Sequence, residues 1–232
     1  MRSVRILEIG DMQNGFTRED GNLYVEGSRE IVAPTNEFLE RIGPGAFDLT
    51  LIVQDTHFPE AYRDSEESET FPIHCEYGTR DWELSVVVPP MPNTRYLLKD
   101  TYTMWSEDVP RTVRIDDPGR RAAYGMLFQV VDDPRAPTER TPRDDFLRAV
   151  GLGGGGIDVE VTMLGVASDY CVRYAMEGWL ARGARVTILH DLTRGIEKEM
   201  REVLAEDRYR QYANGRVRAV ASGDLLRELA GA

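Results

Sequence analysis

The stretch between residues 159 and 183 constrains the fold of this chain more than any other. It begins with a short apolar run rich in β-branched side chains, which is typical of a buried strand. After a turn at residues 165–168, apolar side chains recur at the spacing of one helix face: Val172, Ala175, Met176, Trp179 and Leu180. Ser168 or Asp169 is expected to cap the start of this helix, and Gly183 to end it. A buried strand that leads directly into an amphipathic helix is the repeating unit of α/β proteins.

The rest of the chain repeats this pattern. Helical patterns occur at residues 28–42, 196–213 and 225–229, and the first of these helices is expected to begin at Pro34, because proline is favoured in a first turn. Further short apolar runs predict strands at residues 4–9, 49–53, 96–98, 185–189 and 217–220. This alternation predicts an α/β fold with three α/β/α layers around a mainly parallel central sheet.

Three segments lie outside this pattern. Residues 58–70 are polar and acidic, which predicts a loop. Residues 104–140 combine prolines with mixed charges, so we expect one domain spanning residues 1–232 with an insertion at about 104–140. The glycines at 153–156 precede a strand instead of joining a strand to a helix, so we expect a flexible connection and no phosphate loop.

Composition argues against several kinds of partner. Asp and Glu total 40 against 28 Lys and Arg, and the resulting net charge of −12 disfavours nucleic acid and anionic membranes. The two cysteines do not form a disulfide framework, and no apolar run resembles a membrane span or a signal peptide. We therefore expect a cytoplasmic protein that acts on a small molecule, and we expect it to form a homo-oligomer.

Residues capable of catalysis follow several of the predicted strands. Asp11, Lys99 and Cys171 each lie just beyond a strand end, and the carboxyl ends of parallel strands share one edge of a sheet. There Asp11 could accept the thiol proton, while Lys99 supplies positive charge to both neighbours. The first turn of a helix should lower the pKa of the Cys171 thiol below its free value of about 8.5. Taken singly, each residue also has an ordinary explanation: a surface carboxylate, an ion-paired lysine or a buried cysteine.

A second group of residues has the chemistry of metal ligands. Asp55 and His57 follow the strand at 49–53, and His74 lies beyond an acidic loop. One carboxylate and two imidazoles suit Zn²⁺, Fe²⁺ or Mn²⁺, with coordination positions left for water or substrate. Because the spacing is irregular, two histidines that cap or fill the core are about as good an explanation.

Five motifs occur in order along the chain, and together they resemble one family. They are Asp-Met-Gln-Asn-Gly-Phe, Asp-Thr-His, Phe-Pro-Ile-His-Cys-Glu-Tyr-Gly-Thr, Leu-Leu-Lys and Gly-Val-Ala-Ser-Asp-Tyr-Cys-Val. The set resembles the isochorismatase-like cysteine hydrolases, and within them the nicotinamidases, over roughly residues 4–99 and 157–200. The resemblance implies that Cys171 attacks an amide carbonyl, that Asp11 is the general base, and that Lys99 is their electrostatic partner. It also implies a cis peptide between Val166 and Ala167, with the N–H groups of Ala167 and Cys171 forming an oxyanion hole.

The same resemblance implies a metal site and a ring-binding pocket. Asp55, His57 and His74 match metal ligands, and a further acidic ligand matches Glu67, with the neighbouring Glu66 as a competitor. The expected ion is Zn²⁺, with Fe²⁺ or Mn²⁺ as alternatives. The aromatic residues expected around the substrate are Phe16, Phe71 and Tyr102.

The implied activity is hydrolysis of nicotinamide to nicotinate and ammonia through a thioester. Two alternatives remain at this point. One is hydrolysis of another small amide or ureido compound by the same residues. The other is a catalytically silent relative that acts as a binding module.

Overall fold

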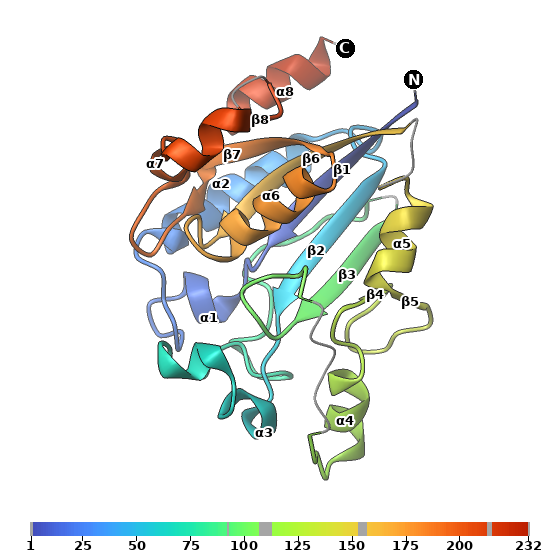
Figure 1. Ribbon diagram of the computed structural model, residues 1–232, viewed down its shortest axis with the longest axis vertical. Coiled ribbons are helices and arrows are strands. Elements are labelled where there is room, and N and C mark those ends of the chain that lie inside the picture. Colours follow the sequence, from blue (N-terminus) through green and yellow to red (C-terminus); the bar gives the residue numbers. More distant parts are fainter. Residues whose placement is uncertain (1, 92, 107–112, 153–156, 213–214, 232) are drawn as a thin grey trace.

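The computed structural model describes residues 2–91, 93–106, 113–152, 157–212 and 215–231, and its centre is one mainly parallel sheet (Figure 1). Within these residues the strand order is β5-β4-β3-β2-β1-β6-β7-β8. The parallel strands are β1 (Arg2–Gly10), β2 (Leu49–Asp55), β3 (Thr94–Lys99), β6 (Ile157–Val166), β7 (Arg185–Arg194) and β8 (Val217–Val220). Two short antiparallel strands, β4 (Gln129–Val131) and β5 (Arg140–Pro142), extend the edge beside β3. The sheet predicted from the sequence is therefore confirmed.

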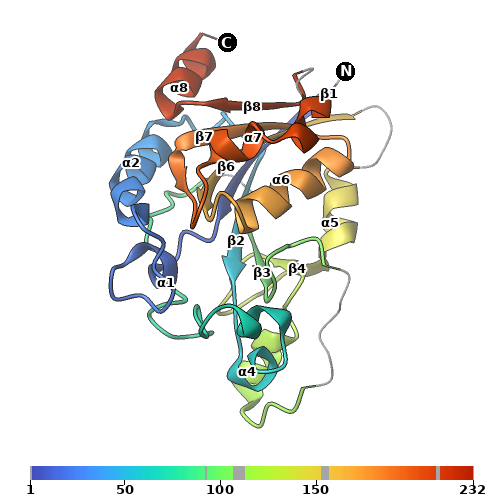
Figure 2. The same ribbon diagram turned by 60° about the vertical axis from the view of Figure 1, so that its left-hand side comes forward.

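Helices cover both faces of the sheet (Figure 2). On one face α2 (Ser28–Arg41) and α8 (Ser222–Ala230) pack against the side chains of Leu7, Ile9 and Leu189. On the other face lie α5 (Arg143–Ala149), α6 (Cys171–Ala181) and α7 (Met200–Leu204). The remaining helices are short: α1 (Asn14–Thr17), α3 (Pro59–Tyr62), α4 (Pro118–Tyr124) and the 3₁₀ helices η1 (Glu66–Glu69) and η2 (Asp207–Tyr212). This is the three-layer α/β/α architecture expected from the alternating pattern.

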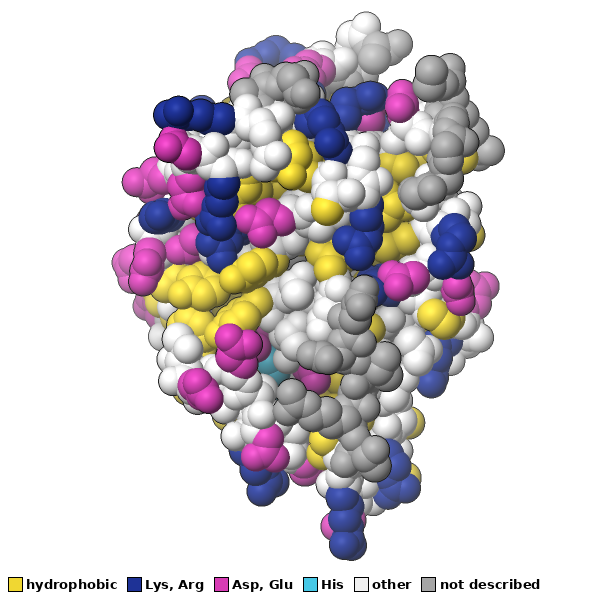
Figure 3. Space-filling model, in the orientation of Figure 1, with side chains coloured by type: hydrophobic (Ala, Val, Ile, Leu, Met, Phe, Trp, Pro, Cys, Tyr) yellow, Lys and Arg dark blue, Asp and Glu magenta, His cyan; other side chains and the backbone are white. Residues whose placement is uncertain are grey.

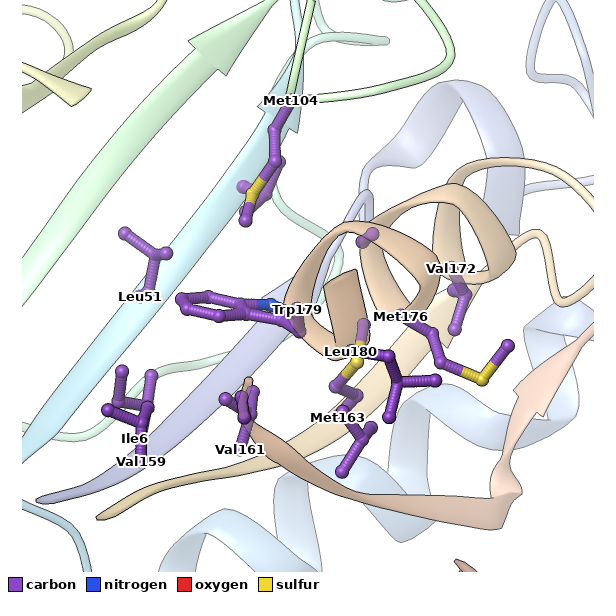
Figure 4. Close-up of a cluster of buried hydrophobic side chains, with 14 of the residues drawn as sticks. Ile6, Leu51, Met104, Val159, Val161, Met163, Val172, Met176, Trp179 and Leu180 are labelled. Atoms are coloured by element: carbon purple, nitrogen blue, oxygen red, sulfur yellow. The ribbon is translucent and has the colours of Figure 1, made fainter. Parts of the chain in front are cut away.

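The packing of α6 fixes the position of Cys171 at its first residue. Figure 4 shows Trp179 and Leu180 of α6 directed at the sheet strands beneath them. Trp179 is fully buried, and its indole N–H donates a hydrogen bond to the carboxylate of Glu8 on β1. Burying an aromatic side chain of this size contributes about 2–3 kcal/mol. The apolar stripe read from the sequence therefore anchors the helix that begins at the cysteine.

The capping predicted for α6 is wrong at its start and right at its end. Neither Ser168 nor Asp169 caps the helix, since Asp169 instead accepts hydrogen bonds from the backbone N–H groups of residues 196, 197 and 198. These bonds fix residues 196–198 as a loop, so the single helix expected at 196–213 does not form, and α7 and η2 are separate. Gly183 does follow the helix with a φ of +93°, as expected.

Two further predictions need correction. The helix at 28–42 begins at Ser28 and not at Pro34, because the proline lies on the exposed side of α2, where water can satisfy the carbonyl that it leaves unpaired. Residues 58–70 are not simply a loop, since α3 and η1 form there. Within residues 104–140, α4, β4 and the start of β5 are ordered elements, while residues 107–112 lie outside the described part of the chain, as do the glycines at 153–156. No helix in the described residues is long and apolar enough to cross a membrane.

Candidate active site and metal centre

The carboxyl ends of β1, β2, β3 and β6 meet around the ammonium group of Lys99. Its Nζ lies 3.0 Å from Asp11 Oδ2 and 3.2 Å from Asp55 Oδ1. The same Nζ lies 3.6 Å from Cys171 Sγ. Asp55 and Lys99 are opposite each other in the register of β2 and β3, so the pairing of these strands sets one of the contacts directly. The structure thus brings together the residues that the sequence placed at strand ends.

The approach of β1 to β6 requires glycine at residue 165. Gly165 has a φ of +130°, and a Cβ atom there would overlap the carbonyl oxygen of Gly10 on β1. Beyond it, the peptide between Val166 and Ala167 is cis, as the resemblance implied. The carbonyl of Ala167 accepts the backbone N–H of Val172 at 3.1 Å, which ties this turn to the first turn of α6.

Burial and charge fix the protonation of Lys99 and affect that of Asp11. Burial would lower the pKa of Lys99, but the Asp11 and Asp55 carboxylates hold it well above its usual value, so the ammonium stays charged. Burial raises the pKa of Asp11, and Lys99 opposes this rise. Asp11 is paired with Lys99 through Oδ2, and its raised pKa makes it a better proton acceptor than an ordinary carboxylate.

The expected low pKa of Cys171 is wrong. Burial raises the pKa of its thiol well above the usual range, and the nearby Lys99 only partly opposes this effect. The sequence indicates the helix start, which favours a thiolate, but not the desolvation that disfavours one. The resting cysteine is therefore a neutral thiol, and its activation requires a base within reach.

Four side chains beside this site form a cluster suited to a metal ion. The ligand atoms of Asp55, His57, Glu67 and His74 all lie within 4.8 Å of one another, and all four residues are buried. Asp55 Oδ2 is 3.2 Å from His57 Nε2 and 3.0 Å from His74 Nε2. Glu67 completes the cluster, with Oε1 3.6 Å from His74 Nε2 and Oε2 3.7 Å from His57 Nε2. Glu66 is exposed, so the structure selects Glu67 between the two neighbours.

The chemistry of this donor set fits a divalent cation. His74 Nδ1 lies 2.8 Å from the carbonyl oxygen of Pro72, a contact that places the ring proton on Nδ1 and leaves Nε2 as a ligand. Burial lowers the pKa of His57, which keeps its imidazole neutral. Burial and the nearby Asp55 raise the pKa of Glu67 to about 9, and its Oε2 is buried with no hydrogen-bond partner among the described residues. Such a carboxylate is stabilised by a cation placed between the four donors.

Gln13 holds the backbone of Asp55 in place. Its amide nitrogen donates to the carbonyl oxygens of Asp55 and Trp82, both at 2.9 Å, and its oxygen accepts the Asp55 N–H at 2.8 Å. The side chain is fully buried. Gln13 therefore fixes the backbone of Asp55, the residue that contacts both Lys99 and the two imidazoles.

Aromatic side chains lie close to one another on both sides of Cys171 in the sequence and beside His74. Phe16 packs against His74 with ring centroids 5.2 Å apart. Phe71 lies 6.3 Å from Tyr102 and 5.6 Å from Tyr170, the residue before Cys171. The sequence did not single out Tyr170 and Tyr174, whose rings lie 5.6 Å and 6.3 Å from that of Tyr102. The sequence signal for these two residues is their spacing of four, which places both side chains on one face of a helix that begins near Cys171. Figure 3 shows apolar side chains gathered beside a histidine on this side of the molecule.

Comparison with solved structures identifies the fold of this chain. No protein-family model matches the chain. An isochorismatase-like hydrolase from Alkaliphilus metalliredigens superposes with a TM-score of 0.63, covering 97% of this chain and 98% of that one at 16% identity. The chain therefore has the isochorismatase-like hydrolase fold, as the motifs predicted.

The relatives within this class include nicotinamidases. A pyrazinamidase of Pyrococcus horikoshii, solved in complex with zinc, has a TM-score of 0.59 and 23% identity, covering 94% of this chain and 98% of the other. The nicotinamidase/pyrazinamidase of Mycobacterium tuberculosis is 25% identical over 199 residues, which is 84% of this chain and 89% of the relative. Both the fold comparison and the sequence comparison thus agree with the resemblance found in the motifs.

Proposed function

We propose that this protein is a cysteine amidohydrolase that converts nicotinamide and water to nicotinate and ammonia. The observation that carries the proposal is the position of Lys99, whose ammonium touches Asp11, Asp55 and Cys171 at once. This ammonium links the Cys171 thiol and the buried carboxylate of Asp11 to a second buried cluster, which contains four possible metal ligands. The similarity to nicotinamidases supports the same substrate.

In the proposed reaction, Asp11 takes the proton of the Cys171 thiol as the sulfur attacks the amide carbonyl. The N–H groups of Ala167 and Cys171 stabilise the oxyanion of the tetrahedral intermediate. Asp11 then returns the proton to the departing nitrogen, which leaves as ammonia and gives a thioester. A water molecule gives its proton to Asp11 and attacks the thioester, and the products are a carboxylic acid and the regenerated thiol. Lys99 holds positive charge beside both acidic groups throughout.

The four-residue cluster is proposed to hold a divalent ion, preferably Zn²⁺, with Fe²⁺ or Mn²⁺ as alternatives. When bound there, such an ion supplies a ligand position for the pyridine nitrogen of the substrate. Phe16, Phe71 and Tyr102 are proposed to enclose the ring. Fixing the ring at one end and the amide at the other would bring the carbonyl to the sulfur. We also propose that the whole chain is one catalytic domain, with residues 104–140 as an insertion.

The test is ammonia release from metal-loaded protein given nicotinamide or benzamide, which has the amide but no ring nitrogen. We expect turnover of nicotinamide, poor turnover of benzamide, and none of either by Cys171→Ala. If wild-type protein takes up no divalent ion, or releases ammonia only from aliphatic or ureido compounds, the nicotinamide assignment is wrong. A silent binding module would instead release ammonia from none of these amides.

A further inference from the structure

The segment 113–131 packs beside the part of the chain that carries the two imidazoles. Figure 1 shows α3 and α4 at the end of the molecule that lies beyond the carboxyl ends of β2 and β3, and an ion pair between Glu60 and Arg120 joins the two helices. The apolar contacts join this segment to the chain just after His57: Phe58, Trp82, Leu98, Ile115, Ala123, Tyr124, Met126, Leu127 and Val131 form one buried cluster. This segment therefore packs against Phe58, the residue that directly follows His57.

Two irregular segments, one with His57 and the other with His74, run side by side. The N–H of His57 donates to the carbonyl oxygen of Cys75 at 3.1 Å, and the N–H of Tyr77 donates to the carbonyl oxygen of His57 at 3.0 Å. These two bonds make a short parallel bridge between His57 and Glu76. His57 lies in the bridge, and His74 directly precedes Cys75, which accepts one of its two hydrogen bonds. The separation of the two imidazoles therefore depends on how firmly the bridge is held.

Arg120 of α4 joins the two sides of the bridge. Its Nη1 lies 3.0 Å from Glu76 Oε1, and its Nη2 lies 3.4 Å from Glu60 Oε2. Its guanidinium carbon lies 5.6 Å from the centroid of the Phe58 ring. Phe58 directly follows His57, is 1% exposed, and is enclosed by the rings of Tyr77 and Tyr124. One side chain thus contacts residues on both segments that supply the histidines.

We propose that Arg120 is a positioning residue for the metal centre, which keeps His57 and His74 at the spacing that an ion requires. It acts through Glu60, Glu76 and Phe58 and touches no ligand itself. The inference rests on the proposed metal site. It assigns to the segment 113–131 a role in retaining the ion.

The expected effect is on metal affinity more than on folding. The three side chains of the ion pairs are about one-third exposed, and pairs of this kind contribute about 1 kcal/mol or less to stability. A ligand shell reacts more strongly to small displacements, since residues that orient metal ligands typically change affinity by about 10–100-fold. Because Arg120 contacts neighbours of the ligands and not the ligands themselves, we expect a loss of affinity at the lower end of this range, about tenfold.

The experiment compares Arg120→Met with Arg114→Met. Arg114 lies on the same segment and forms an exposed ion pair with Asp116 at 3.0 Å, so it controls for the loss of a surface charge. Zn²⁺ affinity is measured by competition with a chromophoric chelator, and the dissociation rate by transfer of the ion to excess chelator. Arg120→Met should bind Zn²⁺ about tenfold more weakly and lose it faster, whereas Arg114→Met should match the wild type. Urea unfolding of the metal-free proteins should differ little among the three.

A double-mutant cycle with Glu76→Gln separates positioning from general destabilisation. If Arg120 acts through Glu76, either substitution alone should weaken Zn²⁺ binding, and the second should add little to the first. Arg120→Lys should restore part of the affinity because it retains one ion pair. Equal Zn²⁺ affinity in Arg120→Met and wild type, or fully additive losses in the cycle, would refute the inference and leave the proposed function standing. Wild-type protein that binds no Zn²⁺ would instead refute the metal site itself.

Discussion

Replacing Lys99 by methionine should raise the pKa of the Cys171 thiol. Burial already raises this pKa, and the ammonium of Lys99, 3.6 Å from the sulfur, opposes the rise. At about 4 Å two opposite unit charges attract by about 4 kcal/mol at the effective dielectric constant of about 20 that suits protein sites. Since one pKa unit corresponds to about 1.4 kcal/mol, the thiol pKa should rise by up to about three units. The thiolate population at a given pH would then fall by up to about a thousandfold.

The same substitution should weaken the folded state. Asp11 and Asp55 both lose the ammonium that lies 3.0 and 3.2 Å from their oxygens. Removing one partner from a buried ion pair costs about 3–5 kcal/mol of stability. Urea unfolding must therefore show that the variant is folded under the assay conditions before its activity is interpreted.

Asp11→Asn is the matched control for this experiment. Its carboxylate raises the pKa of Cys171, so removing the charge should lower that pKa while also abolishing turnover. The measurement is the rate of thiol alkylation by iodoacetamide as a function of pH, with ammonia release in parallel. Two inactive variants should thus shift the alkylation profile in opposite directions. If the Lys99→Met profile superimposes on that of the wild type, the ammonium does not control the thiol and the reasoning fails.

Three other outcomes are expected. Cys171→Ala should abolish ammonia release with little change in unfolding free energy. Cys75→Ala should keep turnover, because the Cys75 side chain is fully buried and a substrate cannot reach it, whereas Cys171 is partly exposed. The reverse pattern would contradict the mechanism. Removing the metal, or making His57→Ala, should raise KM for nicotinamide by about tenfold or more, equivalent to about 1.4 kcal/mol, and should hardly affect benzamide. Burial raises the pKa of Glu8 from 4.5 to about 7, so this group favours the folded state when protonated, and its contribution of about 3 kcal/mol is lost as pH rises between these values. Glu8→Gln, which can still accept the Trp179 hydrogen bond, should flatten the pH dependence of urea unfolding in that window; an unchanged slope would show that Glu8 does not titrate there.

The placement of the candidate site was predictable because it follows from one rule of architecture. Asp11 follows β1, Lys99 ends β3, and Cys171 begins the helix after β6. Strands of a parallel sheet end at a common edge. The hydrophobic pattern predicts the strands, and the common edge of a parallel sheet then predicts that these side chains lie close together. The motif resemblance then selected Glu67 as the added acidic residue near the imidazoles, and the structure agrees.

Properties that depend on contacts between distant segments were not predictable. The sequence shows Asp169 beside a helix start, but only the fold shows that residues 196–198 claim its carboxylate. It shows Cys171 in a first turn, but not the burial that raises its pKa. Arg120 has no local pattern at all, because its partners Glu60 and Glu76 lie far away in the chain. Local periodicity gives elements and their order, whereas desolvation and side-chain partners come from packing.

The buried charges give an independent reason for a divalent ion at the four-residue cluster. Asp11, Asp55 and Glu67 are all buried, and Lys99 is the buried ammonium that lies among them. Without an ion, burial and Asp55 raise the pKa of Glu67 and keep this carboxyl protonated, whereas binding an ion requires it to ionise. The three carboxylates and one ammonium then carry two excess negative charges, and uncompensated charge in a protein interior is strongly unfavourable. A cation of charge two among the ligand atoms would balance the group, whereas a monovalent cation would not. Asp55 contacts Lys99 and both imidazoles. A neutral side chain at residue 55 could still bind an ion, but the Lys99 ammonium would then keep only the Asp11 carboxylate as a counter-charge.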